Sequence, residues 1–158
     1  LESDLFFSGM RPAVNVGLSV SRVGGAAQTK AMKSASGTIR IDLAQFREME
    51  VFTQFSSDLD EETKQQLAYG NGLMELLKQP LGHPMSLAEQ VITLVAATGK
   101  LFLTIPKEQI KETQGKLLQY FEDVHPEIGE TIQKDKVLTD ELRQQILNVA
   151  GEFLEQAK

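Results

Sequence analysis

Apolar residues recur at helical spacing along the chain from about residue 29 onward. In residues 28–55 they are spread around the helix rather than confined to one stripe, which predicts a long central helix packed on more than one side. Gly37 is expected to bend this helix, because glycine costs roughly 1 kcal/mol relative to alanine in a helix interior. The pattern therefore predicts that this segment is a central element of a helical protein.

A second helix is expected to begin at a cap on Asp58 or Asp60, since an aspartate side chain can accept hydrogen bonds from the first free amides of a helix. It should reach about Tyr69. There the glycines of residues 70–72 are expected to interrupt it, before a short continuation to Gln79.

The next two helices carry clear start and stop signals. Ser86 with Glu89 three residues later forms a capping-box pattern, and Gly99 is expected to end the helix that follows. Leu87, Val91, Leu94 and Val95 would give this helix one apolar face. Pro106 fits the first turn of the next helix.

The last part of the sequence is expected to contain a polar connector after His125-Pro126 and a final helix that opens at Thr139. Taken together, the apolar pattern predicts a mainly α protein, a helical bundle of about five to seven helices over residues 29–158. Residues 1–28 differ: glycine and proline interrupt them often, and apolar residues alternate with small polar ones between Val14 and Arg22. That alternation predicts a short strand, for which the remaining sequence offers no pairing partner.

The composition removes several kinds of function. The 158 residues hold 22 acidic and 16 basic side chains, a formal net charge of -6, which argues against general nucleic-acid binding. The lack of cysteine excludes disulfides, thiolate nucleophiles and cysteine-ligated zinc, and His83 and His125 are too few for a histidine metal cluster. No apolar run approaches the roughly 20 residues of a membrane helix. We therefore expect no metal site, no nucleic-acid partner and no membrane insertion.

No complete enzymatic signature is present, and two features remain as candidate sites. The acidic run 58–62 could bind a cation, but acidic side chains at a helix start are favoured by the helix dipole, so capping is the better interpretation. Arg22 follows the strand-like run and precedes a stretch of small residues. It could pair with a carboxylate of its own chain, which composition alone favours, or reach an anion on another chain or on a missing domain.

Residues 8–28 closely resemble the alpha subunits of F-type ATP synthases, and the likeness continues through residues 43–48, 57–60 and 75–79 before it thins after about Lys100. The run Val23-Gly24-Gly25-Ala26-Ala27-Gln28 favours alpha over beta subunits and over vacuolar-type relatives. More than twenty nearly continuous matching residues are far more specific than a short motif. The sequence is thus identified as similar to the C-terminal part of this family.

The resemblance implies a division into two parts. Residues 1–28 would be the last piece of an α/β nucleotide-binding domain whose P-loop lies upstream of this chain, and residues 29–158 would be the C-terminal helical bundle domain. The predicted strand would then be a remnant of that domain. Arg22 would be the arginine finger that alpha extends into the catalytic site of the neighbouring beta subunit, where fixed positive charge stabilises the transition state of phosphoryl transfer.

The same resemblance places Arg11, Pro12 and Gln79 at the adenine side of a non-catalytic ATP site. The family often has a second glutamine two residues after Gln79, and this chain has Leu81 there, which puts one adenine hydrogen bond in doubt. ATP and Mg would belong to the intact subunit. Without the upstream P-loop no cofactor is expected for this chain, and the isolated chain is expected to be inactive as an enzyme.

The partners implied by the resemblance are beta subunits in an alternating ring, the gamma rotor subunit and a delta or peripheral-stalk subunit. The acidic run 58–62 would face the rotor, a role compatible with helix capping. The complex would lie on an energy-transducing membrane, at the cytoplasmic face of a bacterial plasma membrane, and the isolated chain would be soluble. Two alternatives stay open: a free-standing helical interaction module, and a subunit of a related ring ATPase.

Overall fold

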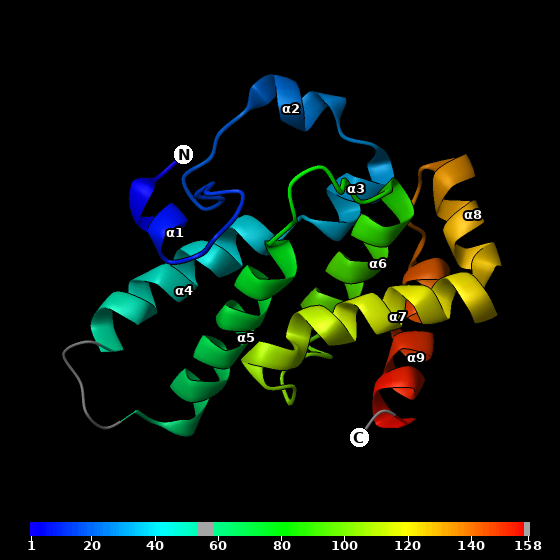
Figure 1. The fold of residues 1–158 in the computed structure, drawn as a ribbon. Helices are drawn as coiled ribbons and strands as arrows, with labels where there is room; N and C mark the ends of the chain where they lie inside the picture. Colours follow the sequence, from blue (N-terminus) through cyan, green and yellow to red (C-terminus); the bar gives the residue numbers. More distant parts are fainter. Residues whose placement is uncertain (54–58, 157–158) are drawn as a thin grey trace.

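The computed structural model describes residues 1–53 and 59–156, and these residues are mainly helical (Figure 1). They form no β-strand, and the bundle after residue 29 is confirmed, with seven α-helices within the described residues of that part. The elements are α1 Ser3–Phe7, α2 Arg22–Ala27, α3 Lys30–Ala35, α4 Ile39–Thr53, α5 Glu61–Leu77, α6 Leu87–Thr98, the 3-10 helix η1 Lys107–Gln109, α7 Ile110–Val124, α8 Pro126–Asp135 and α9 Asp140–Gln156.

Helix α6 is the centre of the bundle and contacts α3, α5, α7, α8 and α9. The expected single apolar face is wrong, because α6 is buried on all sides from Ala88 to Ala97 apart from two half-buried positions near its start. A helix that is apolar all round belongs inside a core rather than on its surface. The capping box is confirmed: the Glu89 backbone amide donates to Ser86 Oγ at 3.2 Å, and the Ser86 amide donates to Glu89 Oε2 at 2.6 Å.

This cap gives a first test of the fold. Ser86→Ala removes the acceptor for the Glu89 amide, so it is expected to cost about 1 kcal/mol of the free energy of unfolding and to lower Tm by about 2–4 °C for a protein of this size. Thermal unfolding followed by circular dichroism measures the shift. Ser19→Ala is the control, because Ser19 is exposed and lies outside every helix, and an equal shift in both variants would contradict the capping role.

The long helix expected over residues 28–55 is wrong, because this segment forms α3 and α4 with a break at Ser36–Thr38. Gly37 ends a helix here instead of bending one. The prediction that this helix is central and packed on more than one side is also wrong. Helix α4 buries one stripe, formed by Ile39, Leu43 and Phe46, and leaves Ile41 61% exposed. Phe55 lies outside the described residues, as does the side chain of Phe52.

The interruption expected at residues 70–72 is also wrong, because α5 runs through them without a break to Leu77. Helix α5 packs on α4, and Gly70 lies at their contact. A Cβ built on Gly70 would come within 2.6 Å of Phe46 Cβ, so only glycine lets the two helices approach this closely. The glycine serves the packing of the two helices and does not end α5.

Beyond α6, the expected features are mostly found. Gly99 caps the end of α6, Pro106 precedes η1 and α7, and Thr139 Oγ1 accepts from the Leu142 amide at the start of α9. The polar connector after Pro126 is wrong, because α8 forms there, with Ile128 and Ile132 almost fully buried. Their four-residue spacing gives α8 one apolar stripe within an otherwise polar sequence.

The N-terminal strand expected between Val14 and Arg22 does not form. Residues 16–18 are a turn, residues 19–21 have no regular structure, and α2 begins at Arg22. A lone strand leaves its backbone donors and acceptors without partners, and none of the described residues lies alongside it as a strand. In Figure 1, α2 stands at the top of the view in the connection between α1 and α3.

Candidate functional site

Arg22 is the first residue of α2, and its side chain is exposed. The Ser21 hydroxyl caps this helix by accepting from the Gly24 amide at 2.9 Å, which stabilises the first helical turn beside the arginine. Among the residues that the structure describes, the Arg22 guanidinium makes no ion pair or hydrogen bond. The alternative in which it pairs with a carboxylate of its own chain is therefore not realised within this part of the protein.

The surroundings of Arg22 are apolar and open. None of the six residues of α2 is buried, and Val20 and Val23, on either side of Arg22, are 76% and 83% exposed. Small residues fill the rest of α2. Apolar side chains this exposed in one short segment are typical of a surface that another protein covers. Within the described residues, the segment thus carries one free cation in an uncovered apolar strip.

The preceding segment is held firmly on the bundle. Asn15 Nδ2 donates to Glu2 Oε1 at 2.7 Å, and Arg47 Nη1 of α4 lies 3.4 Å from the other oxygen of Glu2. The Asn15 hydrogen bond and, after it, the Arg47 charge hold the pKa of Glu2 below its ordinary value. Leu5 and Met10 pack with Met74 and Leu77 of α5 in a small second core. The backbone before Arg22 therefore starts from an anchored position.

Arg11, Pro12 and Gln79, proposed from the sequence as one adenine-side group, lie together in the structure. The backbone N–H of Gln79 donates to the backbone carbonyl oxygen of Arg11 at 2.9 Å, which joins the N-terminal segment to the end of α5. Arg11 and Pro12 are exposed, while Gln79 is half-buried. The Arg11 guanidinium lies 4.5 Å above the Phe6 ring centroid, a cation–π contact that positions it.

The side chains of this group are of types that can contact a planar heterocyclic base. The Pro12 ring offers an exposed apolar face against which a base can stack. The side-chain carboxamide of Gln79 can both donate and accept hydrogen bonds. Leu81, two residues further on, is 100% exposed and offers no polar atom from its side chain. The group thus offers one apolar ring and one carboxamide, and Leu81 adds no polar side-chain atom beside them.

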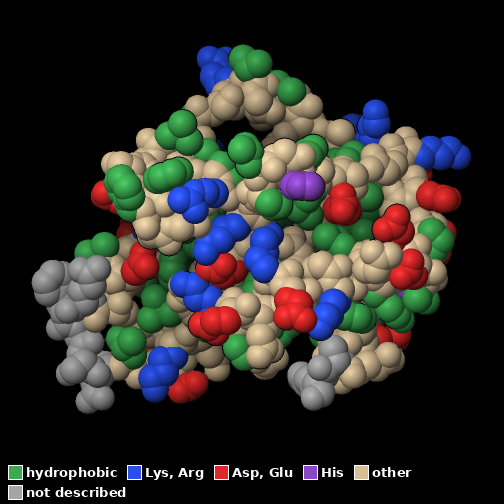
Figure 2. All heavy atoms as spheres, viewed as in Figure 1, with side chains coloured by type: hydrophobic (Ala, Val, Ile, Leu, Met, Phe, Trp, Pro, Cys, Tyr) green, Lys and Arg blue, Asp and Glu red, His purple; other side chains and the backbone are tan. Residues whose placement is uncertain are grey.

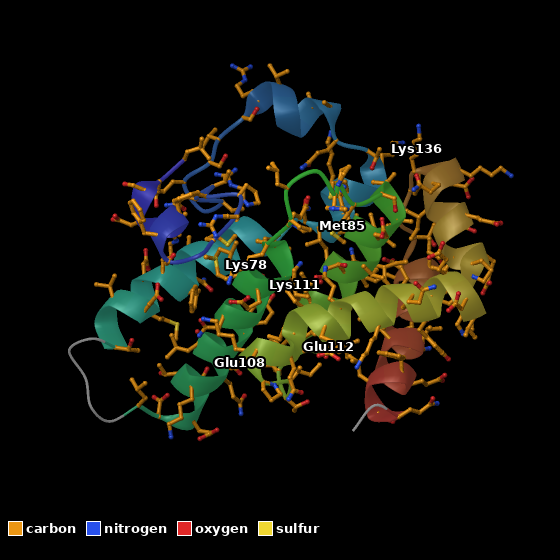
Figure 3. The ribbon with its side chains drawn as sticks, in the orientation of Figure 1. Lys78, Met85, Glu108, Lys111, Glu112 and Lys136 are labelled. Atoms are coloured by element: carbon orange, nitrogen blue, oxygen red, sulfur yellow. The ribbon has the colours of Figure 1, made fainter. Side chains whose placement is uncertain are left out.

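Next to Gln79 lies a cluster of charged residues that sequence reasoning missed. Glu75 lies 2.7 Å from Lys78 Nζ and 3.7 Å from Lys107 Nζ. Lys111 approaches from α7 and donates to Gln114 Oε1 at 2.7 Å (Figure 3). Burial lowers the pKa of Lys111 below its ordinary value. The spacing of Glu75 and Lys78 predicts their pair, whereas the other two lysines arrive only through tertiary packing.

The acidic run 58–62 is described from residue 59 onward, so Asp58 lies outside the described residues. Asp60 caps α5, as its Oδ1 accepts from the Thr63 amide at 2.7 Å. The hydrogen bonds from Thr63 lower the pKa of Asp60. Capping by Asp60 is confirmed, and the described residues bring no three acidic or histidine side chains together in a way that could hold a metal ion.

No helix among the described residues is long and apolar enough to cross a membrane. Comparison with known proteins then places the sequence. The profile of the family described as "ATP synthase alpha/beta chain, C terminal domain" matches residues 28–153.

Curated relatives give the same result. The chain is 50% identical over 153 residues to the ATP synthase subunit alpha of Clostridium kluyveri, which covers 97% of this chain and 30% of that protein. It is 53% identical over 152 residues to the subunit alpha of Lawsonia intracellularis (96% and 30%) and 49% identical over 154 residues to that of Rickettsia bellii (98% and 30%). The chain spans about 30% of the length of these relatives. The sequence resemblance to alpha subunits is confirmed, and the protein belongs to the family of C-terminal domains of ATP synthase alpha and beta subunits.

Proposed function

We propose that this protein acts as the C-terminal part of an ATP synthase alpha subunit and that Arg22 is an arginine finger acting in trans. In a ring of alternating subunits it would reach the catalytic site of the adjacent beta subunit. The observation that carries this proposal is the exposed guanidinium of Arg22, which has no partner within the described residues and lies at the start of α2, beside the Ser21 cap.

The chemistry of the finger follows from its charge and shape. Phosphoryl transfer spreads negative charge over the terminal phosphate oxygens in the transition state, and fixed donors that meet this charge lower the barrier. An arginine is permanently charged and presents up to five N–H donors in a planar fork. Because the donor comes from another subunit, hydrolysis becomes sensitive to the arrangement of the ring interface.

In the intact subunit we assign a second, non-catalytic nucleotide to the group of Arg11, Pro12 and Gln79. ATP bound there with Mg would supply a ligand that stabilises the subunit interface. Pro12 would hold the face of the adenine, and Gln79 would read one polar edge of it, with Leu81 leaving the other polar edge unmatched. Residues 1–28 would belong to the nucleotide-binding domain and residues 29–158 to the helical bundle domain.

The remaining expectations concern assembly. The partners would be beta subunits, a gamma rotor that faces the acidic run 58–62, and a delta or peripheral-stalk subunit, in a complex that couples ATP synthesis and hydrolysis to proton transport. Such a complex would be peripheral to an energy-transducing membrane, at the cytoplasmic face of a bacterial plasma membrane. The high identity to alpha subunits favours this assignment over a related ring ATPase subunit.

Reconstitution tests the proposal. A full-length subunit ending in this sequence, mixed with beta and gamma subunits, is expected to form a ring with MgATP hydrolysis. The isolated chain is expected to hydrolyse no ATP and to show no micromolar binding in a calorimetric titration with MgATP. Hydrolysis or tight ATP binding by the isolated chain, or failure of the full-length subunit to enter a ring, would contradict the assignment.

A further inference from the structure

Helices α6, α7 and α8 enclose a groove of about 700 Å³ that none of the sites described above uses. Its apolar lining comes from all three helices and includes Ala88 and Ile92 of α6, Leu118 and Phe121 of α7, and Pro126 of α8. A volume of this size holds several aliphatic side chains. The groove therefore offers room for the apolar face of a helix rather than for a single side chain.

Two glycines leave the groove open to a close approach. Gly115 of α7 is exposed, and a Cβ built on it would meet no atom within 4 Å. A Cβ on Gly129 of α8 would meet only the Ala88 side chain, at 3.7 Å. Small residues at such positions allow another backbone to come closer than larger side chains would. Gly115 in particular is not needed for the packing of its own bundle.

The charge around the groove has one sign. Glu89, Glu122 and Glu130 line it, and no lysine, arginine or histidine among the described residues does. Glu89 is held by the Ser86 amide, whereas Glu122 and Glu130 are exposed and form no ion pair within the described part of the protein. Figure 2 shows acidic side chains over α7 and α8 with hydrophobic side chains between them. An occupant thus meets an apolar floor and a negative rim.

We propose that this groove binds an amphipathic helix of a partner protein, with an apolar face toward Leu118 and Pro126 and with lysines or arginines toward Glu122 and Glu130. A helix laid into a groove buries one apolar stripe and keeps its polar face at the rim, which is the arrangement of floor and rim found here. Glu122 is on α7 and Glu130 on α8, so basic residues on both sides of the stripe have an acceptor.

Charge decides among possible occupants. An acidic peptide or an anionic lipid surface would be repelled by the two free carboxylates and by the net charge of -6 of the protein. A basic helix is attracted both by these two carboxylates and by the negative net charge of the protein. The interaction does not depend on Arg22 or on nucleotide, so the experiment below tests it separately from the function proposed above.

The test uses a fluorescein-labelled, designed 18-residue helix with leucine and alanine on one face and lysine on the other, titrated with the full chain and followed by fluorescence polarisation. The wild-type protein is expected to bind it with micromolar affinity. A peptide with glutamate in place of each lysine is expected to bind at least about tenfold more weakly.

Two variants locate the binding. Gly115→Leu adds a side chain to the groove at a position where a Cβ meets no atom within 4 Å, and is expected to weaken binding about tenfold or more. Gly151→Leu on α9 is the matched control, because a Cβ there also meets no atom within 4 Å and Gly151 does not line the groove. This variant should bind the basic peptide with the same affinity as the wild type. The double variant Glu122→Gln/Glu130→Gln, which changes only exposed side chains, should weaken binding and reduce its dependence on salt.

The proposal is overturned if Gly115→Leu and the double glutamine variant bind as tightly as Gly151→Leu, if both peptides bind equally, or if no binding is seen. Analytical sedimentation of the free protein tests whether the groove instead receives a second copy of the same molecule. If the protein dimerises and Gly115→Leu abolishes the dimer, the groove receives a second copy of the same molecule, and the proposed partner helix is wrong.

Discussion

Replacing Arg22 with lysine in the full-length subunit is expected to lower multi-site ATP hydrolysis by the assembled ring by roughly 10³-fold or more, the range found for arginine fingers supplied in trans. Lysine keeps the charge but loses the planar fork that can contact two phosphate oxygens at once. Since Arg22 is exposed and packs against no core residue, the substitution should leave Tm and ring assembly unchanged. Steady-state turnover at saturating MgATP measures the effect.

Arg40→Lys provides the matched control, because Arg40 is also an exposed arginine near the start of a helix, on α4. Its turnover should match that of the wild type. MgATP binding by the ring should be unchanged in both variants, since the finger acts on the transition state more than on the bound substrate. Near-normal turnover in the Arg22 variant would refute the assignment, and an equal loss in both variants would show a general effect of the substitution.

Gly70→Ala is expected to destabilise the bundle by about 1–3 kcal/mol, even though alanine is the better helix former by about 1 kcal/mol. The added Cβ would overlap the Phe46 ring and would also lie 2.6 Å from Phe46 Cβ, so rotation of the ring cannot relieve the overlap. Phe46 is only 5% exposed, and α4 has to move away from α5. Chemical denaturation measures the loss.

Gly151→Ala is the control that measures the gain in helix propensity alone. It is a helical glycine with no atom within 4 Å of a built Cβ, so the substitution should stabilise the protein by about 0.5–1 kcal/mol. The two variants should therefore change stability in opposite directions. If Gly70→Ala were stabilising as well, the close contact of α4 and α5 would be wrong.

Local signals predict the helix ends well. The Ser86–Glu89 box, Gly99 and the Thr139 start depend on side chains within four residues of the backbone they cap, so the sequence contains the whole interaction. Asp60 is a further case, as it bonds to the Thr63 amide. Such signals say where a helix begins or ends but not what covers it.

The errors share another cause, which is tertiary contact. The glycines at residues 70 and 72 predict a break because the role of Gly70 in fitting Phe46 is invisible in the local sequence. Helix α8 escapes prediction because only Ile128 and Ile132 of its apolar stripe stand out among polar residues. Alternation alone predicts the strand before Arg22, but a strand also needs a paired neighbour, which the described residues do not supply.

The candidate site divides in the same way. The contact between Arg11 and Gln79 joins positions far apart in sequence, and the family resemblance groups them without any local pattern. Lys78 follows Glu75 by three residues, so their pair is local, whereas Lys107 of η1 and Lys111 of α7 are brought to this place only by the fold. Arg22 differs from its neighbours already in the sequence, yet its exposure is visible only in the structure.

The most direct test of the finger is the binding of a transition-state analogue. The assembled ring is loaded with MgADP and fluoroaluminate, and the trapped nucleotide is counted for the wild type and for Arg22→Lys. If Arg22 meets the charge of the transferring phosphoryl group, the variant should bind MgADP normally and lose stable trapping with fluoroaluminate. Equal trapping in both rings would show that Arg22 does not contact the transferring group and would contradict the central claim.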